Sequence, residues 1–244
     1  MKNPTRSILL TTIHCGLLAL SLVQARAAKQ HPFNGKDLSG WRAPTGTWSV
    51  VKGVRLAPAN PEQFVVTPGE GVLLNNATSH TVDLVSEVEF GDMQLHVEFC
   101  IPRHSNSGVY LMGRYEMQVY DSFGVAKDQY PGIECGGIYP RWLNNQNVDG
   151  SSPLVNASKP AGEWQTFDIT FRAPRFDAAG RKIANATLLK MLHNGKLIHE
   201  NLELKGPTRG ALWEEEKPTG PLRLQGDHGP VAFRNLWVRP LVRN

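Results

Sequence analysis

Hydrophobic and polar residues alternate in short runs along this chain of 244 residues, and glycine or proline interrupts the runs about every ten residues. In the run 93–101, apolar Met93, Leu95 and Val97 alternate with polar Gln94 and His96. A period of two is typical of strands that bury one face. No segment carries the apolar stripe of a helix over about three turns, so the pattern predicts a chain built from strands.

The clearest predicted pair of strands lies in ATLLKMLHNGKLIHENLEL, residues 186–204. Asn194-Gly195 divides this segment, and that dipeptide favours the type I′ turn of a two-stranded hairpin. Many short strands at this spacing predict an all-β fold, an antiparallel β-sandwich or jelly roll. The segment 131–160 is rich in Asn, Gly, Ser and Pro, and we expect it to form a long loop across one face of the sandwich.

The stretch YEMQVYD, residues 115–121, combines a strand pattern with candidate chemistry. Glu116 and Gln118 are two residues apart and share one face, whereas Asp121 would return to that face only after a β-bulge. Laminarinase-type β-glucanases space two catalytic carboxylates in this way, but here the middle position is an amide. The spacing is compatible with a solvated strand face and with a carbohydrate-binding groove.

Two histidines lie beside carboxylates in the predicted strands and their loops. His96 and Glu98 are two apart on one strand, as an acid–base pair or part of a divalent metal site would be. Asp227 and His228 lie in the glycine-flanked loop QGDHG, which is equally the composition of a hairpin turn. Neither pair is specific by itself.

The first 27 residues have the pattern of a signal peptide. Lys2 and Arg6 precede an uncharged apolar run, and the sequence ARA at 25–27 is typical of a cleavage site. The apolar run is short for a membrane span. We therefore expect a secreted or periplasmic protein with one domain over 28–244 and no membrane span in the mature chain.

Charge and cysteine content narrow the function classes. The formal net charge is +4, but basic and acidic residues are interspersed, so nothing favours a nucleic-acid partner. The mature chain keeps Cys100 and Cys135, which form either one disulfide or two buried thiols. No cluster of Cys and His residues has the spacing of a metal site.

Several other side chains suit the binding of sugar hydroxyls or sugar rings. Asn106 lies in a polar bend, where its amide can bind a hydroxyl or cap the turn. Trp142 and Trp213 lie in loop-rich segments and are the better candidates for a sugar-stacking platform, although most tryptophans pack in cores.

Six motifs in one order resemble the 3-keto-disaccharide hydrolase domain family of secreted and periplasmic bacterial proteins. The resemblance runs from about residue 33 to 241, and the motifs are FNGKDLSGW, NSGVYLMGRYEMQVYDS, CGGIYP, NASKPAGEWQTFDITF, LHNGKLIHEN and GPLRLQGDHGPVAFRNLWVRPL. It implies a sandwich of the concanavalin A-like lectin and glucanase type. It also implies a substrate class, glycosides whose sugar is oxidised to a ketone at C3.

A ketone at C3 makes the C2 proton acidic, so a base can remove it and the enolate can expel the oxygen at C1. Such chemistry needs a base near C2, a stabiliser for the C3 oxyanion, which a divalent metal could supply, and an acid for the leaving oxygen. The residues carried over from the resemblance are, as catalytic candidates, Glu116, His228 and Asp121, and as substrate-binding candidates Gln118, Arg234, Glu98, Asn106 and Tyr139. Trp142, the candidate for sugar stacking from its place in a loop, completes the substrate-binding set.

Roles within this set stay open at the level of sequence. His228 or Glu116 is the expected base, and Arg234 or a bound cation is the expected oxyanion stabiliser. Arg234 has a competing role, an ion pair that ties the last strand to its neighbour. The alternative functions are a non-catalytic carbohydrate-binding module and a glycosidase that uses two carboxylates.

Overall fold

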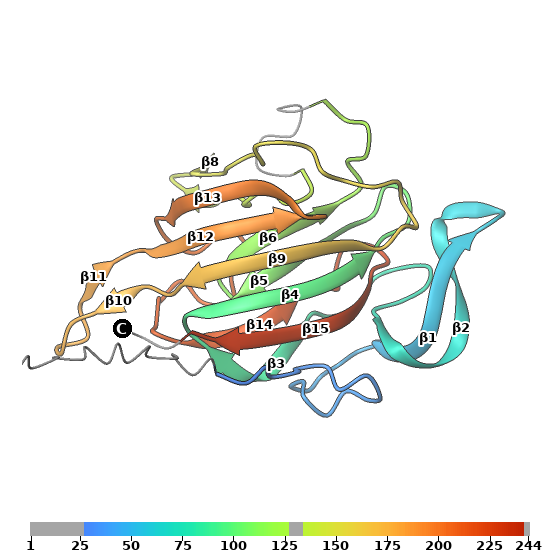
Figure 1. The fold of residues 1–244 in the computed structure, drawn as a ribbon, viewed down its shortest axis with the longest axis horizontal. Helices are drawn as coiled ribbons and strands as arrows, with labels where there is room; N and C mark the ends of the chain where they lie inside the picture. The colour runs from blue at the N-terminus through green and yellow to red at the C-terminus, as the bar shows by residue number, and fades with distance from the viewer. Residues whose placement is uncertain (1–26, 127–133, 242–244) are drawn as a thin grey trace, which may run out of the picture.

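The computed structural model describes residues 27–126 and 134–241 (Figure 1). Every regular element in these ranges is a β-strand, and the strand pairs within each sheet are antiparallel, which confirms the all-β prediction. Within the same ranges no helix has the length and apolar character needed to cross a bilayer. Residues 1–26, which hold nearly all of the predicted signal peptide, lie outside the described residues.

Two sheets stack face to face as a sandwich (Figure 1). The larger sheet has seven strands in the order β1 (Ser49–Ala57), β2 (Asn60–Leu74), β15 (Ala232–Pro240), β4 (Met93–Cys100), β9 (Gln165–Arg172), β12 (Ala186–His193) and β13 (Lys196–Leu204). The smaller sheet has four, in the order β3 (Leu84–Phe90), β14 (Gly220–Leu224), β5 (Asn106–Leu111) and β6 (Tyr115–Tyr120). Two short pairs complete the fold, β7 (Arg141–Leu143) with β8 (Gln146–Val148) and β10 (Arg175–Phe176) with β11 (Lys182–Ala184).

The alternation in the sequence places one face of each sheet in a common core. Strand β4 alternates buried and half-buried residues from Met93 to Glu98, as its pattern predicts. In β6, Tyr115, Met117 and Val119 are fully buried, and the Tyr115 ring lies 5.6 Å from the ring of Phe171 in the other sheet. Glu116 and Gln118 therefore project from the opposite, outer face of the smaller sheet.

The turn at Asn194-Gly195 has the predicted geometry. His193 pairs with Lys196, so the loop has two residues, and φ is 50° at Asn194 and 78° at Gly195. Positive φ at both positions is the signature of a type I′ turn, which matches the twist of the strands that it joins.

The two cysteines of the mature chain are free and buried. Cys100 of β4 belongs to a second apolar cluster, with Val51 of β1 and Phe64 of β2 in the same sheet. Cys135 lies in the main core. Of the two alternatives posed by the sequence, the structure shows thiols.

Part of the expected long loop is ordered against the edge of β6. The backbone N–H of Gly136 donates to the Gln118 carbonyl (2.7 Å), and the Gln118 N–H donates to Gly137 (2.9 Å). A bridge between Met117 and Ile138 continues this pairing. The segment then forms the β7–β8 hairpin, so the loop contains strands that the sequence pattern did not reveal, and it covers the edge of β6.

Candidate active site

Side chains from three neighbouring strands converge on the outer face of the four-stranded sheet. Strand register sets Tyr110 of β5 opposite Glu116 of β6 and Arg223 of β14 opposite Tyr110. Two residues further along, Gln118 and Gln225 occupy the same face. These side chains therefore form a polar surface on the outer face of the smaller sheet.

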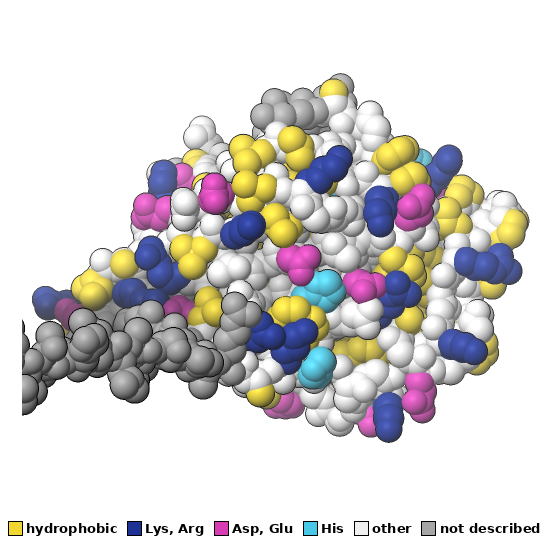
Figure 2. Space-filling view, in the orientation of Figure 1, with side chains coloured by type: hydrophobic (Ala, Val, Ile, Leu, Met, Phe, Trp, Pro, Cys, Tyr) yellow, Lys and Arg dark blue, Asp and Glu magenta, His cyan; other side chains and the backbone are white. Residues whose placement is uncertain are grey.

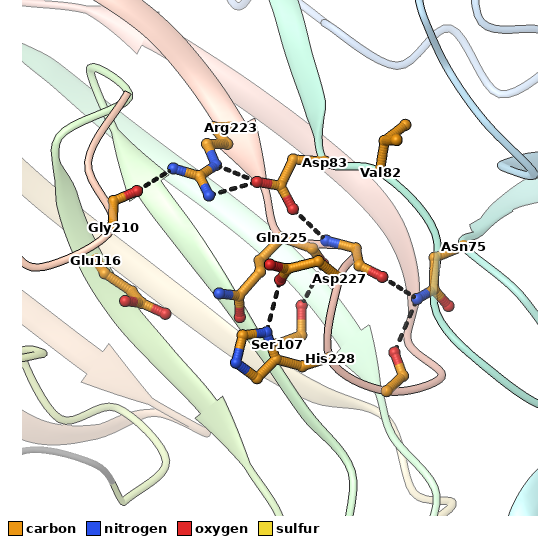
Figure 3. Close-up of polar contacts among 12 residues, drawn as sticks. Asn75, Val82, Asp83, Ser107, Glu116, Gly210, Arg223, Gln225, Asp227 and His228 are labelled. Carbon is orange, nitrogen blue, oxygen red and sulfur yellow. Dashed lines mark hydrogen bonds and ion pairs between the residues drawn. The ribbon is translucent and has the colours of Figure 1, made fainter. Parts of the chain in front are cut away.

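This surface is the floor of a cavity of about 300 Å³, near the lower end of the range for small-molecule sites. Figure 3 shows Glu116, Gln225 and His228 directed toward the same space. The residues that line the cavity are Asn106, Tyr110, Glu116, Gln118, Tyr139, Arg209, Gly210, Arg223, Gln225, Asp227 and His228.

Gly108 makes room for the Glu116 carboxyl group. It lies on β5 between Asn106 and Tyr110, and a Cβ at this position would lie 2.3 Å from Glu116 Oε1. Any side chain at 108 would therefore displace the carboxyl group from the cavity floor. This contact explains the glycine in the motif NSGVY by geometry.

Glu116 is a buried carboxyl group that is held by neutral donors. The Tyr110 hydroxyl donates to Oε2 (2.7 Å), and the amide of Gln118 is best satisfied with its nitrogen toward Oε1 (3.1 Å). Burial raises the pKa of Glu116 to about 8, against the lowering effect of the Tyr110 hydrogen bond and the charge of Arg223. At neutral pH Glu116 is therefore predominantly protonated and can act as an acid.

Tyr110 stays a hydrogen-bond donor. Burial, followed by the negative charge of Glu116, raises the pKa of its hydroxyl far above the ordinary value. Arg223 lies over its ring, with the guanidinium carbon 4.2 Å from the centroid. Tyr110 therefore lies between Glu116, to which its hydroxyl donates, and Arg223, which contacts its ring.

Asp83 fixes both Arg223 and the following loop (Figure 3). The Arg223 Nε donates to Asp83 Oδ2 (2.6 Å), and the N–H of Gly226 donates to Oδ1 (2.7 Å). A further Arg223 N–H donates to the Gly210 carbonyl. A charge-assisted fork of this kind restricts the guanidinium to one orientation.

Asp227 and His228 form a hydrogen-bonded pair at the rim of the cavity. His228 Nδ1 lies 2.6 Å from Asp227 Oδ1 (Figure 3). A carboxylate at this distance favours a proton on Nδ1, so the unprotonated nitrogen of the neutral ring is Nε2. Both side chains are about half exposed, so solvent reaches the pair.

The cavity also offers a polar atom that has no hydrogen-bond partner among the described residues. The side-chain oxygen of Gln225 is buried without a hydrogen bond, while its nitrogen lies 3.5 Å from the Tyr110 hydroxyl. A buried acceptor of this kind requires a donor, and a sugar hydroxyl would supply one. Asn106 and Tyr139 line the cavity as well, so the structure brings both together with Glu116.

Asp121 lies apart from this set. Strands β5 and β6 pair in register from Tyr115 to Tyr120 without the bulge that the sequence argument required. The Asp121 carboxylate accepts the backbone N–H of His104 (2.9 Å) and borders a different hollow, with Phe123. The expectation of a bulge was wrong, because the chain leaves the sheet directly after Tyr120.

Glu98 and Arg234 lie on the other sheet. Arg234 Nε donates to Glu98 Oε2 (2.7 Å) between β15 and β4, which is the structural ion pair considered as its competing role. Figure 2 shows acidic, basic and histidine side chains gathered over the middle of this outer face. This pair belongs to β4 and β15 of the larger sheet, whereas the cavity beside Glu116 lies on the outer face of the smaller sheet. Both layers of the sandwich therefore lie between them.

Trp142 is exposed on the β7–β8 hairpin and does not line the cavity itself. It contacts a residue that does, because the guanidinium carbon of Arg209 lies 4.2 Å from the centre of the Trp142 ring. Trp213 is exposed near Arg114 and borders another hollow.

Four residues that line or support the cavity were not predicted from the sequence: Tyr110, Arg223, Arg209 and Asp83. The first two lie in strand patterns, where an alternating polar residue was available as a signal but was not followed. Arg209 and Asp83 lie outside the strands, and no local pattern marks them.

No three His, Cys, Asp or Glu side chains in the described part of the chain are arranged to hold a metal ion.

Comparison with known proteins places the chain in a family. The model of the 3-keto-alpha-glucoside-1,2-lyase-like domain matches residues 29–239. A candidate glycosyl hydrolase from Parabacteroides distasonis shares 28% sequence identity, with a TM-score of 0.61 over 87% of this chain and 84% of that chain. A second from the same organism shares 20%, with a TM-score of 0.48 over 80% and 100%.

More distant similarity extends to the carbohydrate-binding module CBM66 from Bacillus subtilis, at 10% identity and a TM-score of 0.42 over 84% of this chain and 97% of that chain. Among curated proteins none matches. The family match spans both sheets and every residue of the cavity, and so the chain belongs to the 3-keto-alpha-glucoside-1,2-lyase-like domain family.

Proposed function

We propose that the protein cleaves glycosides that carry a ketone at C3, by elimination across C1 and C2 followed by addition of water. Family membership supports a carbohydrate-active enzyme. The observation that carries the proposal is one cavity shared by a histidine–carboxylate pair and a buried, neutral carboxyl group. These are the base and the acid that an elimination requires.

His228 is the base in this scheme. Asp227 holds the proton on Nδ1, so the lone pair of Nε2 is available to take the proton from C2. The electrons of the C2–H bond then form an enolate with the C3 ketone. Glu116 could act as the base only in its deprotonated form, which burial disfavours.

Glu116 is the acid. As the enolate collapses, the C1–O bond breaks, a double bond forms between C1 and C2, and the leaving oxygen takes the Glu116 proton. Tyr110 and Gln118 then donate to the carboxylate that remains. Two donors to the product anion lower the cost of the transfer.

Arg223 takes the role of oxyanion stabiliser that the sequence argument gave to Arg234. It lines the cavity, and Asp83 fixes its orientation before substrate enters. A preorganised cation near a developing negative charge is among the most effective contributions to catalysis. Gln225 and Asn106 are available to bind sugar hydroxyls.

Water completes the reaction. Its oxygen adds to C1 and a proton returns to C2, so the sum of the two stages is hydrolysis to a 3-keto sugar and the free aglycone. The Glu116 carboxylate, which has just lost a proton, is the base available to activate the water, and protonated His228 can return its proton to C2.

The proposal is tested with a 3-keto-glucoside and its unoxidised parent. Elimination predicts release from the keto compound alone, and a substrate deuterated at C2 should react more slowly. Cleavage of both compounds with no isotope effect at C2 would support a two-carboxylate glycosidase instead. Binding without release would support a carbohydrate-binding module.

Side-chain roles are tested in the same assay. His228→Ala should lower the rate about 10²- to 10⁴-fold, the usual contribution of a general base. Full activity in both His228→Ala and Glu116→Gln would place the chemistry elsewhere. A parallel assay with a chelator and then added divalent metal determines whether a metal contributes to the oxyanion site.

We also propose that the protein is exported to the periplasm or medium, on the basis of the basic start, apolar run and ARA sequence within residues 1–27. Fractionation of cells that express the full chain, with sequencing of the mature N-terminus, tests this. A mature chain that begins near residue 28 is expected, and an intact N-terminus in the cytoplasm would contradict it.

A further inference from the structure

Arg209 differs from the other cations around the cavity because it has no carboxylate partner among the described residues. Arg223 is paired with Asp83, and nearby Arg141 is paired with Asp149 (3.1 Å). The side chain of Arg209 is exposed, lines the cavity, and makes one described contact, with the ring of Trp142. Its positive charge is therefore available to a ligand.

A built turn places Arg209 at the wall of the cavity. Its backbone N–H donates to the carbonyl of Pro140 (2.8 Å), and the next residue, Gly210, accepts from Arg223. On the other side, the Thr208 hydroxyl accepts the N–H of Glu116 (3.1 Å) and donates to the Arg114 carbonyl (2.9 Å). These bonds tie the turn to the cavity floor at both ends.

Trp142 limits the orientation of the guanidinium group. A guanidinium carbon 4.2 Å from a ring centre is within the range of a cation–π contact. The ring occupies one side of the guanidinium group, which leaves N–H donors at the edge of the group for other partners. Such an edge matches the two oxygens of a carboxylate.

The position of this edge indicates which part of the substrate it meets. Thr208 contacts the backbone of Glu116, and Tyr139, one residue before Pro140, donates its N–H to the Glu116 carbonyl (3.2 Å). Arg209 is therefore attached to the Glu116 side of the cavity. In the proposed reaction Glu116 protonates the leaving oxygen, so the leaving group lies on that side.

The unpaired positive charge of the cavity is local to Arg209. The charges of Arg223 and Asp83 compensate each other, and the carboxylate of Asp227 is hydrogen-bonded to His228 at the rim. With Glu116 protonated and His228 neutral, Arg209 is the cation of the lining that no carboxylate of the described residues pairs.

We propose that Arg209 and Trp142 form a subsite for a carboxylate on the leaving group, so that the preferred substrates are 3-keto-glycosides of acidic aglycones. The subsite rests on the proposed function for its assignment to the leaving group, but its affinity for a carboxylate does not depend on turnover.

The test compares two aglycones, one anionic and one neutral. The 3-keto-glucosides of 4-hydroxybenzoic acid and of 4-hydroxybenzamide, in both anomeric forms, have nearly the same shape. We expect kcat/KM for the acid to exceed that for the amide roughly 10- to 100-fold, as for a charge-assisted pair. In Arg209→Gln the ratio should fall to about one, and Arg209→Lys should keep part of it.

Two further variants distinguish a loss of the carboxylate subsite from a general loss of activity. Trp142→Leu should reduce the ratio mainly through KM, because it frees the orientation of Arg209 without touching the acid or base. Arg239→Gln is the matched control, since Arg239 lies near the ring of Trp237 on the other sheet (5.5 Å), and it should leave the ratio unchanged.

Binding of the unoxidised 4-carboxyphenyl and 4-carbamoylphenyl glucosides, measured by calorimetry, separates the two proposals. Tighter binding of the acid that is lost in Arg209→Gln supports the subsite even if no keto compound is cleaved. Equal binding and equal turnover of acid and amide in the wild type would overturn the subsite while leaving the elimination intact. An equal loss on both substrates in Arg209→Gln would also overturn it.

Discussion

The outer faces of the two sheets carry similar residues in opposite environments. On the larger sheet, Glu98 lies beside Arg234 of the neighbouring strand and near His96. On the smaller sheet, Glu116 shares a cavity with Arg223, two strands away, and with His228. Hydrogen bonds from Asn235 and Arg234 lower the pKa of Glu98 despite the opposing effect of partial burial. Burial raises the pKa of Glu116 to about 8.

The hydrogen-bond partners of the two glutamates explain the difference between their pKa values. Arg234 donates directly to Glu98 (2.7 Å), so the anion is stabilised where it stands. Arg223 instead donates to Asp83, and Glu116 receives a neutral hydroxyl from Tyr110. A buried carboxyl group without a directly paired cation keeps its proton and can donate it in a reaction. A carboxylate that is paired with a cation stays ionised and ties two strands together.

The largest expected effect comes from removing the two glutamates in turn. Glu116→Gln should lower turnover of a 3-keto-glucoside about 10²- to 10⁴-fold, because the amide cannot donate a proton to the leaving oxygen. Glu98→Gln should change it less than about twofold, since an ion pair on a sheet surface contributes little. Steady-state kinetics on both variants measure this, and equal losses would contradict the division between the two faces.

A smaller effect is expected at the carboxylate that positions Arg223. Asp83→Asn should lower kcat about 10- to 100-fold, through loss of the fork to Arg223 and of the tie to Gly226. Asp92→Asn is the matched control, because Asp92 pairs with Arg175 far from the cavity (2.6 Å). Circular dichroism of both variants checks folding, and an equal loss of activity in the control would indicate a general effect on stability.

Stability should depend on pH with opposite signs at the two glutamates. Between the ordinary pKa of 4.5 and about 8, folded Glu116 holds a proton that the unfolded chain has lost, so its contribution to stability falls as pH rises. Glu98, whose pKa is lowered, contributes stability above 4.5 that is lost on acidification.

Denaturant unfolding of the wild type and both variants at about pH 3, about pH 5 and about pH 8 measures these contributions. Relative to the wild type, Glu116→Gln should gain stability between about pH 5 and about pH 8, and Glu98→Gln should lose stability between about pH 3 and about pH 5. If the stability of both variants, relative to the wild type, changed in the same direction with pH, the two glutamates would have similar environments.

The smallest effect is expected from a reductant. Since Cys100 and Cys135 are buried thiols, a reducing agent should leave the melting temperature unchanged. A reductant-sensitive melting temperature would indicate a disulfide and a different arrangement of the segment beside β6.

Much of the fold follows from patterns within short segments. Alternation from Met93 to Glu98 places the polar side outward, and Asn194-Gly195 sets a two-residue turn. Local patterns failed where the chain leaves a sheet, as at Asp121, and where a loop is ordered by contacts with β6. Such positions are set by neighbours distant in sequence, which periodicity does not report.

The sequence by itself determined the all-β sandwich, the face on which Glu116 and Gln118 lie, and, through its ordered motifs, the family. Only the tertiary structure decided that Glu116 shares its cavity with His228 and Arg223, whereas Glu98 and Arg234 pair on the opposite sheet. Strand order and burial are the physical reason. They set which charges meet and how much solvent remains, and these in turn determine which carboxyl group keeps its proton.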